Sequence, residues 1–137
     1  MILEFKRGSF ITWKGQSLGY SRDLVVIFDD NTEILTNQKL TFPVDVDYKS
    51  TTIRIRVRLG EFEKYQSFLL SNFMTEGTLV IRGRVIGENY DRVFTFYRAK
   101  LISRGDLNFS DEDGVIPEFE WIALYDFNTN KVFDISL

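Results

Sequence analysis

Arginines alternate with aliphatic residues in two strand-like stretches of this sequence, residues 51–59 and 78–86. Because successive side chains of a β-strand point to opposite faces, the arginines of each stretch share one face and the aliphatic residues share the other. A guanidinium binds carboxylate or phosphate through two parallel hydrogen bonds, so such rows are suited to contact with anions. The arginines concerned are Arg54, Arg56 and Arg58 in the first stretch and Arg82 and Arg84 in the second.

Three roles are open for these arginines: contact with phosphate, lining of a polar lumen, or pairing with acidic strands of a neighbouring subunit. The alternative is a solvated sheet face whose arginines pair across strands within the same domain. The candidate acidic partners for that arrangement are Asp45, Asp47, Glu118 and Glu120.

The residue types needed for most catalytic sites are missing or not suitably arranged. The chain has no cysteine and no histidine, which removes thiol nucleophiles, thiolate metal sites and the commonest general base. Glu118 and Glu120 would lie on one face of a strand about 7 Å apart, a spacing that ordinary solvent-facing carboxylates share. The sequence contains no glycine-rich phosphate loop and no nucleophile elbow. We therefore expect no enzyme activity and no cofactor.

An acidic segment, residues 103–117, offers alternating oxygen ligands from Asp106 onward, as a calcium-binding loop does. However, Asp111 stands where such a loop requires glycine, and Pro117 stands where it requires a bidentate glutamate. We therefore expect an exposed loop without a metal site.

The composition indicates one β-rich domain spanning residues 1–137. Thirteen Phe, six Tyr and two Trp give an aromatic content of 15%, which favours packing on a pleated sheet. The net charge of −3 gives no bulk attraction to nucleic acid or anionic membranes. The amino terminus lacks a signal-like pattern and no apolar stretch is long enough to span a bilayer, so we expect a soluble protein made inside the cell.

The periodicity predicts a mainly β (α+β) fold, an antiparallel β-sandwich or rolled barrel with one flanking α-helix. Turn-forming residues at 29–31 predict a short hairpin between strands 23–28 and 32–36, and a second turn is expected near residue 49. An apolar stripe predicts a helix over residues 61–74. The other predicted strands are 9–13, 44–48, 51–59, 78–86, 92–102, 118–125 and 131–135.

Three parts of the chain carry a resemblance to a known family. The first is residues 13–19 (WKGQSLG) with the apolar residues 25–27; the second is residues 42–45 (FPVD) with the strand entering residues 61–63; the third is residues 116–126 (IPEFEWIALYD). Together with the order of the predicted elements, these segments resemble the tail-tube proteins of tailed bacteriophages and related contractile injection systems. The likeness spans nearly the whole chain.

The resemblance implies a structural virion protein. Subunits of that family form a β-sandwich-like domain flanked by a helix; six subunits close into a ring whose inner wall is a continuous β-barrel, and rings stack into a tube that conducts DNA or an effector. The implied partners are further copies of this chain and other tail proteins such as sheath, baseplate or terminator, with DNA passing only transiently and non-specifically through the lumen. The resemblance implies no membrane partner, and a location in the phage tail after assembly in the host cytoplasm.

On this basis we expect the strands to complete their backbone pairing only when sister copies join side by side. The arginine strand and the loop 103–117 are then expected at subunit contacts, and exchange of all three arginines of that strand for glutamate should block assembly of a folded monomer. The arginines depart from the family, whose DNA-conducting channels tend to be anionic, so a lumenal position is not expected for them. The interface candidates are Arg54, Arg56, Arg58, Arg82, Arg84, Asp106, Asp111, Glu112 and Asp113.

Two other functions remain open. A distal-tail or baseplate adaptor ring shares the same fold but caps the tube instead of polymerising. A monomeric β-sandwich that binds carbohydrate would need a row of exposed aromatic side chains. The candidates for such a row are Trp13, Tyr20, Tyr48 and Tyr90.

Overall fold

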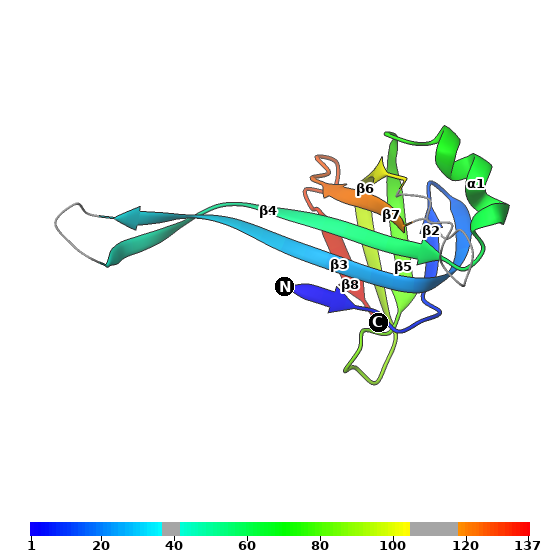
Figure 1. Ribbon diagram of the computed structural model, residues 1–137, viewed down its shortest axis with the longest axis horizontal. Coiled ribbons are helices and arrows are strands. Elements are labelled where there is room, and N and C mark those ends of the chain that lie inside the picture. Colours follow the sequence, from blue (N-terminus) through cyan, green and yellow to red (C-terminus); the bar gives the residue numbers. More distant parts are fainter. Residues whose placement is uncertain (37–41, 105–117) are drawn as a thin grey trace, which may run out of the picture.

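The computed structural model describes residues 1–36, 42–104 and 118–137. Within these ranges one antiparallel sheet of eight strands is accompanied by one helix, which confirms the predicted mainly β fold (Figure 1). In chain order the elements are β1 Ile2–Glu4, β2 Phe10–Trp13, β3 Gln16–Thr36, β4 Pro43–Leu59, α1 Phe62–Ser71, β5 Glu76–Gly83, β6 Arg92–Ser103, β7 Glu118–Leu124 and β8 Phe133–Ser136.

The sheet closes into a barrel within a single chain. The strands pair in the order β3, β2, β5, β6, β7 and β4, and β4 pairs again with β3, which closes the circuit. β1 pairs with β3, and β8 pairs with β6. Closure satisfies the strand edges of the barrel without a second copy. The expectation that sister copies are needed to complete the pairing is therefore wrong for the barrel itself.

The barrel interior is filled by the inward residues of the alternating strands. Trp13 and Trp121 are fully buried, and their rings meet edge to face with centroids 5.6 Å apart. The aliphatic residues of the arginine strand all point inward, as their spacing predicts: Ile53, Ile55, Val57 and Leu59 are buried. Each buried side chain of this size contributes about 1.5–3 kcal/mol relative to exposure.

Helix α1 lies where residues 61–74 predict one, but it ends at Ser71. Its apolar stripe packs on the barrel, since Leu69 is fully buried and the Phe68 ring lies 5.8 Å from the Trp13 ring. The helix lies at the opposite end of the molecule from the long extension of β3 and β4 (Figure 1).

The first hairpin, between β2 and β3, has a two-residue turn. Trp13 pairs with Gln16, so only Lys14 and Gly15 form the turn. Both have positive φ, 53° and 76°, as a type I′ turn requires, and glycine adopts this conformation without strain.

The predicted turns at residues 29–31 and near residue 49 are wrong. β3 and β4 continue through both positions, and Asp30 lies opposite Thr51 in their register. The side chains reinforce this pairing, because Thr51 Oγ1 donates a hydrogen bond to Asp30 Oδ1 at 2.6 Å. The register between β3 and β4 shifts by one residue next to Asn31, and a β-bulge there accommodates the extra residue.

Beyond the barrel, β3 and β4 form a two-stranded ribbon that we call the arm, residues 29–36 and 42–52. It extends along the long axis of the molecule (Figure 1). The eight arm residues of β3 span about 27 Å. Within the described chain, β1 pairs with β3 only as far as Ile27 and β7 pairs with β4 only from Ile53, so no third strand flanks the arm. Isolated two-stranded ribbons are marginally stable in water.

Candidate functional site

The arm presents an apolar face that packs on nothing within the described chain. In the register, Ile34 lies opposite Val46, and the pair Thr32 and Tyr48 lies two residues away on the same face. Ile34, Val46 and Tyr48 are 60%, 55% and 63% exposed. Such a row of exposed apolar side chains marks an interaction surface.

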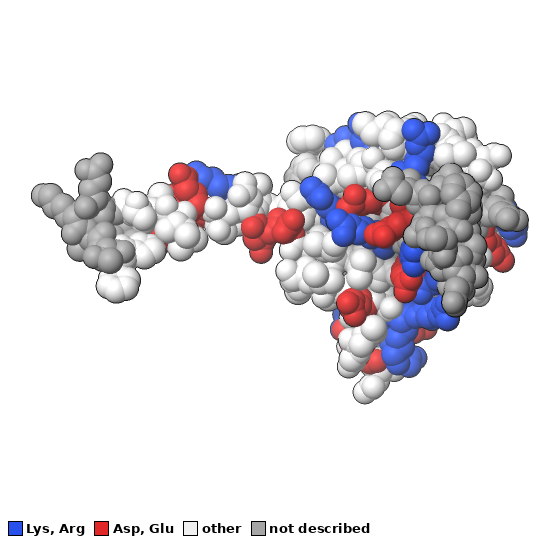
Figure 2. Space-filling model, in the orientation of Figure 1, with Lys and Arg blue, Asp and Glu red and all other residues white. Residues whose placement is uncertain are grey.

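The opposite face of the arm is acidic. Glu33 lies directly opposite Asp47, a like-charge pair that destabilises a sheet, and Lys49 relieves it through an ion pair with Glu33 at 2.6 Å. The arm carries five carboxylates, at positions 29, 30, 33, 45 and 47, against one lysine, a net charge of −4. Figure 2 shows acidic side chains along one side of the arm, with a cationic side chain next to one of them.

The remainder of the described chain is basic. Residues 1–28, 53–104 and 118–137 carry 15 cationic and 11 anionic side chains, a net charge of +4. Residues 105–117 carry four further carboxylates and no cation, so the chain outside residues 29–52 is neutral overall and the arm is its acidic part.

The first arginine row is neutralised mainly by its own sheet. Arg56 Nε lies 3.1 Å from Glu120 Oε1 and 4.0 Å from Glu118 Oε1, and Arg58 lies 3.8 Å from Asp23. This is the pairing within the domain that the sequence left open. The other expected partners, Asp45 and Asp47, instead lie on the arm.

Arg54 differs from its two neighbours in the row. Its cross-strand neighbours are Ile27 and Ile122, and its Nε is buried without a hydrogen-bond partner among the described residues. An interface role for the arginine strand therefore rests more on Arg54 than on Arg56 or Arg58.

Arg82 and Arg84 lie apart from this row, on β5 and just after it. The exposed Arg82 lines a hollow of about 530 Å³ on the outer side of β2 and β5, which we call the basic groove. Its lining residues are Gly8, Phe10, Thr12, Tyr20, Val80, Arg82 and Asp91.

Strand register builds the basic groove from distant parts of the sequence. Phe10 pairs with Tyr20 on one side and with Arg82 on the other, so the three side chains form one row across the sheet. The rings of Phe10 and Tyr20 meet edge to face at 5.3 Å. Tyr20 is 63% exposed, which leaves its ring available to a partner.

Further cations surround the basic groove. Arg84 Nε binds Asp91 Oδ1 at 3.3 Å, and the Lys6 amide donates to the Arg84 carbonyl oxygen at 2.7 Å. This bond places the exposed residues Lys6 and Arg7 beside the groove. The charged residues of the lining itself are Arg82 and Asp91, and Lys6, Arg7 and Arg84 add cations on the neighbouring chain segments.

A second hollow, of about 710 Å³, lies where the arm leaves the barrel, and we call it the base crevice. Its lining is mostly apolar and includes Phe28, Ile53 and Phe133. The rings of Phe28 and Phe133 meet edge to face at 5.7 Å across it.

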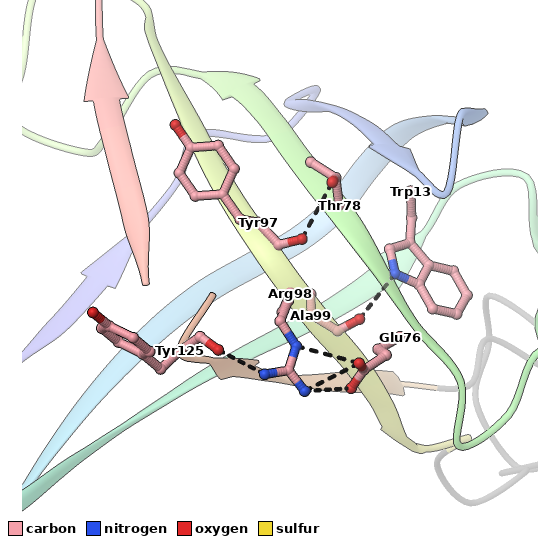
Figure 3. Close-up of polar contacts among 7 residues, drawn as sticks. All are labelled: Trp13, Glu76, Thr78, Tyr97, Arg98, Ala99 and Tyr125. Atoms are coloured by element: carbon pink, nitrogen blue, oxygen red, sulfur yellow. Dashed lines mark hydrogen bonds and ion pairs between the residues drawn. The ribbon is translucent and has the colours of Figure 1, made fainter. Parts of the chain in front are cut away.

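A polar cluster beside β5, β6 and β7 was not anticipated from the sequence (Figure 3). Arg98 Nη2 donates to both carboxylate oxygens of Glu76 at 3.1 Å, and its Nη1 donates to the Tyr125 carbonyl oxygen at 2.7 Å. Deeper in the barrel, the Trp13 indole N–H donates to the Ala99 carbonyl oxygen at 3.2 Å. These bonds fix neighbouring strands to one another.

The titratable groups near this cluster are held in their ordinary charge states. The Tyr97 hydroxyl donates a hydrogen bond to Asp134, which raises the pKa of Tyr97 and lowers the pKa of Asp134. The Thr129 hydroxyl, donating to Asp126 at 2.7 Å, lowers the pKa of that carboxyl group. A tyrosine held protonated and two carboxylates held ionised favour structural roles over proton transfer. Among the described residues, no group of three or more Asp or Glu side chains is arranged to hold a metal ion.

The other predicted site residues have mixed outcomes. Asp106, Asp111, Glu112 and Asp113 lie outside the described residues, as does the rest of the predicted loop 103–117 except Ser103, which ends β6, and Arg104. Of the candidate exposed aromatics, Trp13 is fully buried, so that prediction is wrong. The three tyrosines are exposed but sit on separate elements: Tyr20 on β3 beside β2, Tyr48 on the arm and Tyr90 in the β5–β6 connection.

Two comparisons with known proteins were made, and neither found a relative of this chain. A scan against protein-family models finds no match for this chain, and a search of curated proteins finds none either. Helix α1, in the part of the chain that the structure describes, is too short to cross a membrane.

Proposed function

We propose that this chain is a structural, non-catalytic subunit that assembles with copies of itself through the arm. The product would be a ring, and stacked rings would form the tube of a phage or phage-like tail. The arm carries the proposal, because it exposes an apolar face and has no flanking strand. A neighbouring subunit would bury that face.

The energetics support an intermolecular role for the arm. Its exposed apolar residues gain little from folding, and the facing carboxylates of Glu33 and Asp47 oppose it. Burying side chains of this kind on a partner yields about 1.5–3 kcal/mol each when burial is complete. Two or three such contacts per subunit, repeated around a closed ring, would contribute to the stability of an assembly.

The resemblance to tail-tube proteins supplies the form of the assembly. In that case the ring contains six copies, other tail proteins bind its ends, and DNA or an effector passes through its lumen without specific contacts. The protein would assemble in the host cytoplasm, reside in the virion, and require neither cofactor nor membrane.

Negative-stain electron microscopy of the purified full-length chain, paired with molar-mass measurement, tests the proposal. Rings of six copies, alone or stacked into tubes, are expected. Rings that never stack would indicate an adaptor ring instead. A monomer of 16.1 kDa at every concentration would overturn the proposal.

A further inference from the structure

We propose that the arm of one copy docks into the basic groove of a second copy. The contact is head to tail: the acidic, apolar arm meets the cationic, aromatic surface between β2 and β5. This inference rests on the proposed function and names the surface through which the subunits join.

Charge complementarity selects this pairing. The arm has a net charge of −4, whereas the groove has Arg82 and Asp91 in its lining and Lys6, Arg7 and Arg84 on the adjoining segments. Arg82 is exposed in the groove lining, so its guanidinium is accessible to Asp45 or Asp47 of an incoming arm. Close interfacial charge pairs also guide the two surfaces into register.

The arm carries its apolar side chains on the face opposite to Asp45 and Asp47, so the proposed docking places the ribbon edge-on in the groove, with one face toward the cations and the other toward the aromatic rings. The arm offers Ile34, Val46 and Tyr48, all more than half exposed. The groove offers the exposed ring of Tyr20 beside Phe10. Aromatic and aliphatic groups surrounded by charged residues are the usual composition of a protein interface.

The arm cannot reach the groove of its own chain. β2 pairs with β3 at residues 16–20, whereas the arm begins at residue 29 of the same strand. Nine residues of extended strand separate Tyr20 from Asp29 by about 30 Å, and the arm then points further away. Figure 1 shows β2 and β5 at the end of the barrel remote from the arm.

A contact between two different surfaces is heterologous, and repeating it generates either a closed ring or a helical filament. Pairing of arm with arm is disfavoured because it brings together two segments that each have a net charge of −4, and charged side chains are a common protection of free strand edges. The lining of the base crevice includes Asp30 and contains no Lys or Arg, so it lacks the cationic side chains that the arm requires.

Cysteine crosslinking tests the docking directly, because the native chain has no cysteine. Tyr48→Cys on the arm is mixed with Tyr20→Cys in the groove, and disulfide-linked dimers are measured after mild oxidation. We expect a heterodimer of these two variants. Disulfides between two Tyr48→Cys arms, or between Tyr48→Cys and Leu124→Cys at the base crevice, would overturn the inference. Leu70→Cys on α1 is the control for random collision.

Charge exchange gives a second, independent test. Arg82→Glu should raise the dissociation constant of the assembly about tenfold, and Asp47→Lys in the same chain should restore much of the loss. Lys64→Glu on α1 makes the same charge change at an exposed site away from the groove and should have little effect on assembly. Equal effects of Arg82→Glu and Lys64→Glu would contradict the inference.

The two levels of the proposal fail differently. If rings form but neither crosslinking nor charge exchange involves the groove, the docking inference is wrong and the proposed function stands. If the chain remains a monomer at every concentration, the proposed function fails and the docking inference fails with it.

Discussion

Replacing Ile34 and Val46 together by threonine separates the two roles that an arm residue can have, folding and assembly. Threonine keeps the β-branched shape and the strand preference of both positions while removing apolar surface. The native side chains are 60% and 55% exposed, so the free energy of unfolding of the monomer should change by less than about 0.5 kcal/mol.

The effect on assembly should be much larger. Each side chain has more than half of its surface left to bury on a partner, and its replacement should cost about 1 kcal/mol per contact. The two together amount to about 2 kcal/mol, a factor of about 30 in the dissociation constant. Molar mass over a concentration series measures this shift, and urea unfolding at low concentration measures monomer stability.

The matched control is Ile135→Thr, which makes the same exchange on β8 at a residue that is 43% exposed. It should leave assembly unchanged. If the Ile34→Thr and Val46→Thr chain assembles as the native chain does, with the same unfolding free energy, then the arm does not carry the subunit contact.

Three further predictions concern the fold that presents these surfaces. Arg56→Glu should lower the free energy of unfolding by about 1–2 kcal/mol, because the new carboxylate faces Glu118 and Glu120; an unchanged urea midpoint would contradict the ion pairing within the sheet. This effect also means that exchanging all three arginines of the row would weaken the monomer as well as any assembly. Gly83→Ala should cost about 1–3 kcal/mol, because its Cβ would overlap Ser9 Oγ and lie 2.6 Å from Ser9 Cβ, and Ser9→Gly should recover part of that loss in thermal unfolding. The hydrogen bond between Tyr97 and Asp134 should also make the stability of the fold depend on pH. The lowered pKa of Asp134 stabilises the fold fully above the ordinary carboxyl pKa of about 4, and this stabilisation is lost as the pH falls through the lower folded pKa. The raised pKa of Tyr97 stabilises the fold below the ordinary tyrosine pKa of about 10, and this stabilisation is lost as the pH rises above that value. Tyr97→Phe should therefore flatten both limbs of the stability profile, and identical profiles for the two chains would count against the hydrogen bond.

The periodicity of the sequence correctly predicts which residues of β4 point inward and where helix α1 lies. The inward set of β4 and the outward arginines follow from strict alternation, and the apolar stripe of α1 follows from helical spacing. The β5–β6 hairpin and the closing strands were also identified, since apolar runs between turn residues define them.

The arm was missed because turn propensity is a local signal and strand pairing is not. Asp29, Asp30 and Asn31 favour a turn, yet the long register between β3 and β4 places each of them opposite a serine or threonine and keeps the chain extended. Val46 stands between two aspartates in the sequence and Ile34 follows a glutamate, a pattern that would equally suit side chains facing the core. Only the geometry of the ribbon shows that both side chains are exposed.

The basic groove could not be located from the sequence for a different reason. Arg82 was identified as an interface candidate, but Phe10 and Tyr20 join it only through the pairing of β2 with both β3 and β5. Similarly, the closure of the barrel within one chain depends on β4 pairing with β7 on one side and β3 on the other, which no local pattern determines.

Amide hydrogen exchange as a function of protein concentration tests the central claim most directly, because it reports on the arm and the groove in the unmodified chain. At low concentration, the amides of residues 29–36 and 43–52 should exchange much faster than those of the barrel strands. At high concentration, the arm amides should become protected, and the already slow amides around Phe10, Tyr20 and Arg82 should slow further. Arm protection that is the same at every concentration would contradict the claim that a second copy covers the arm.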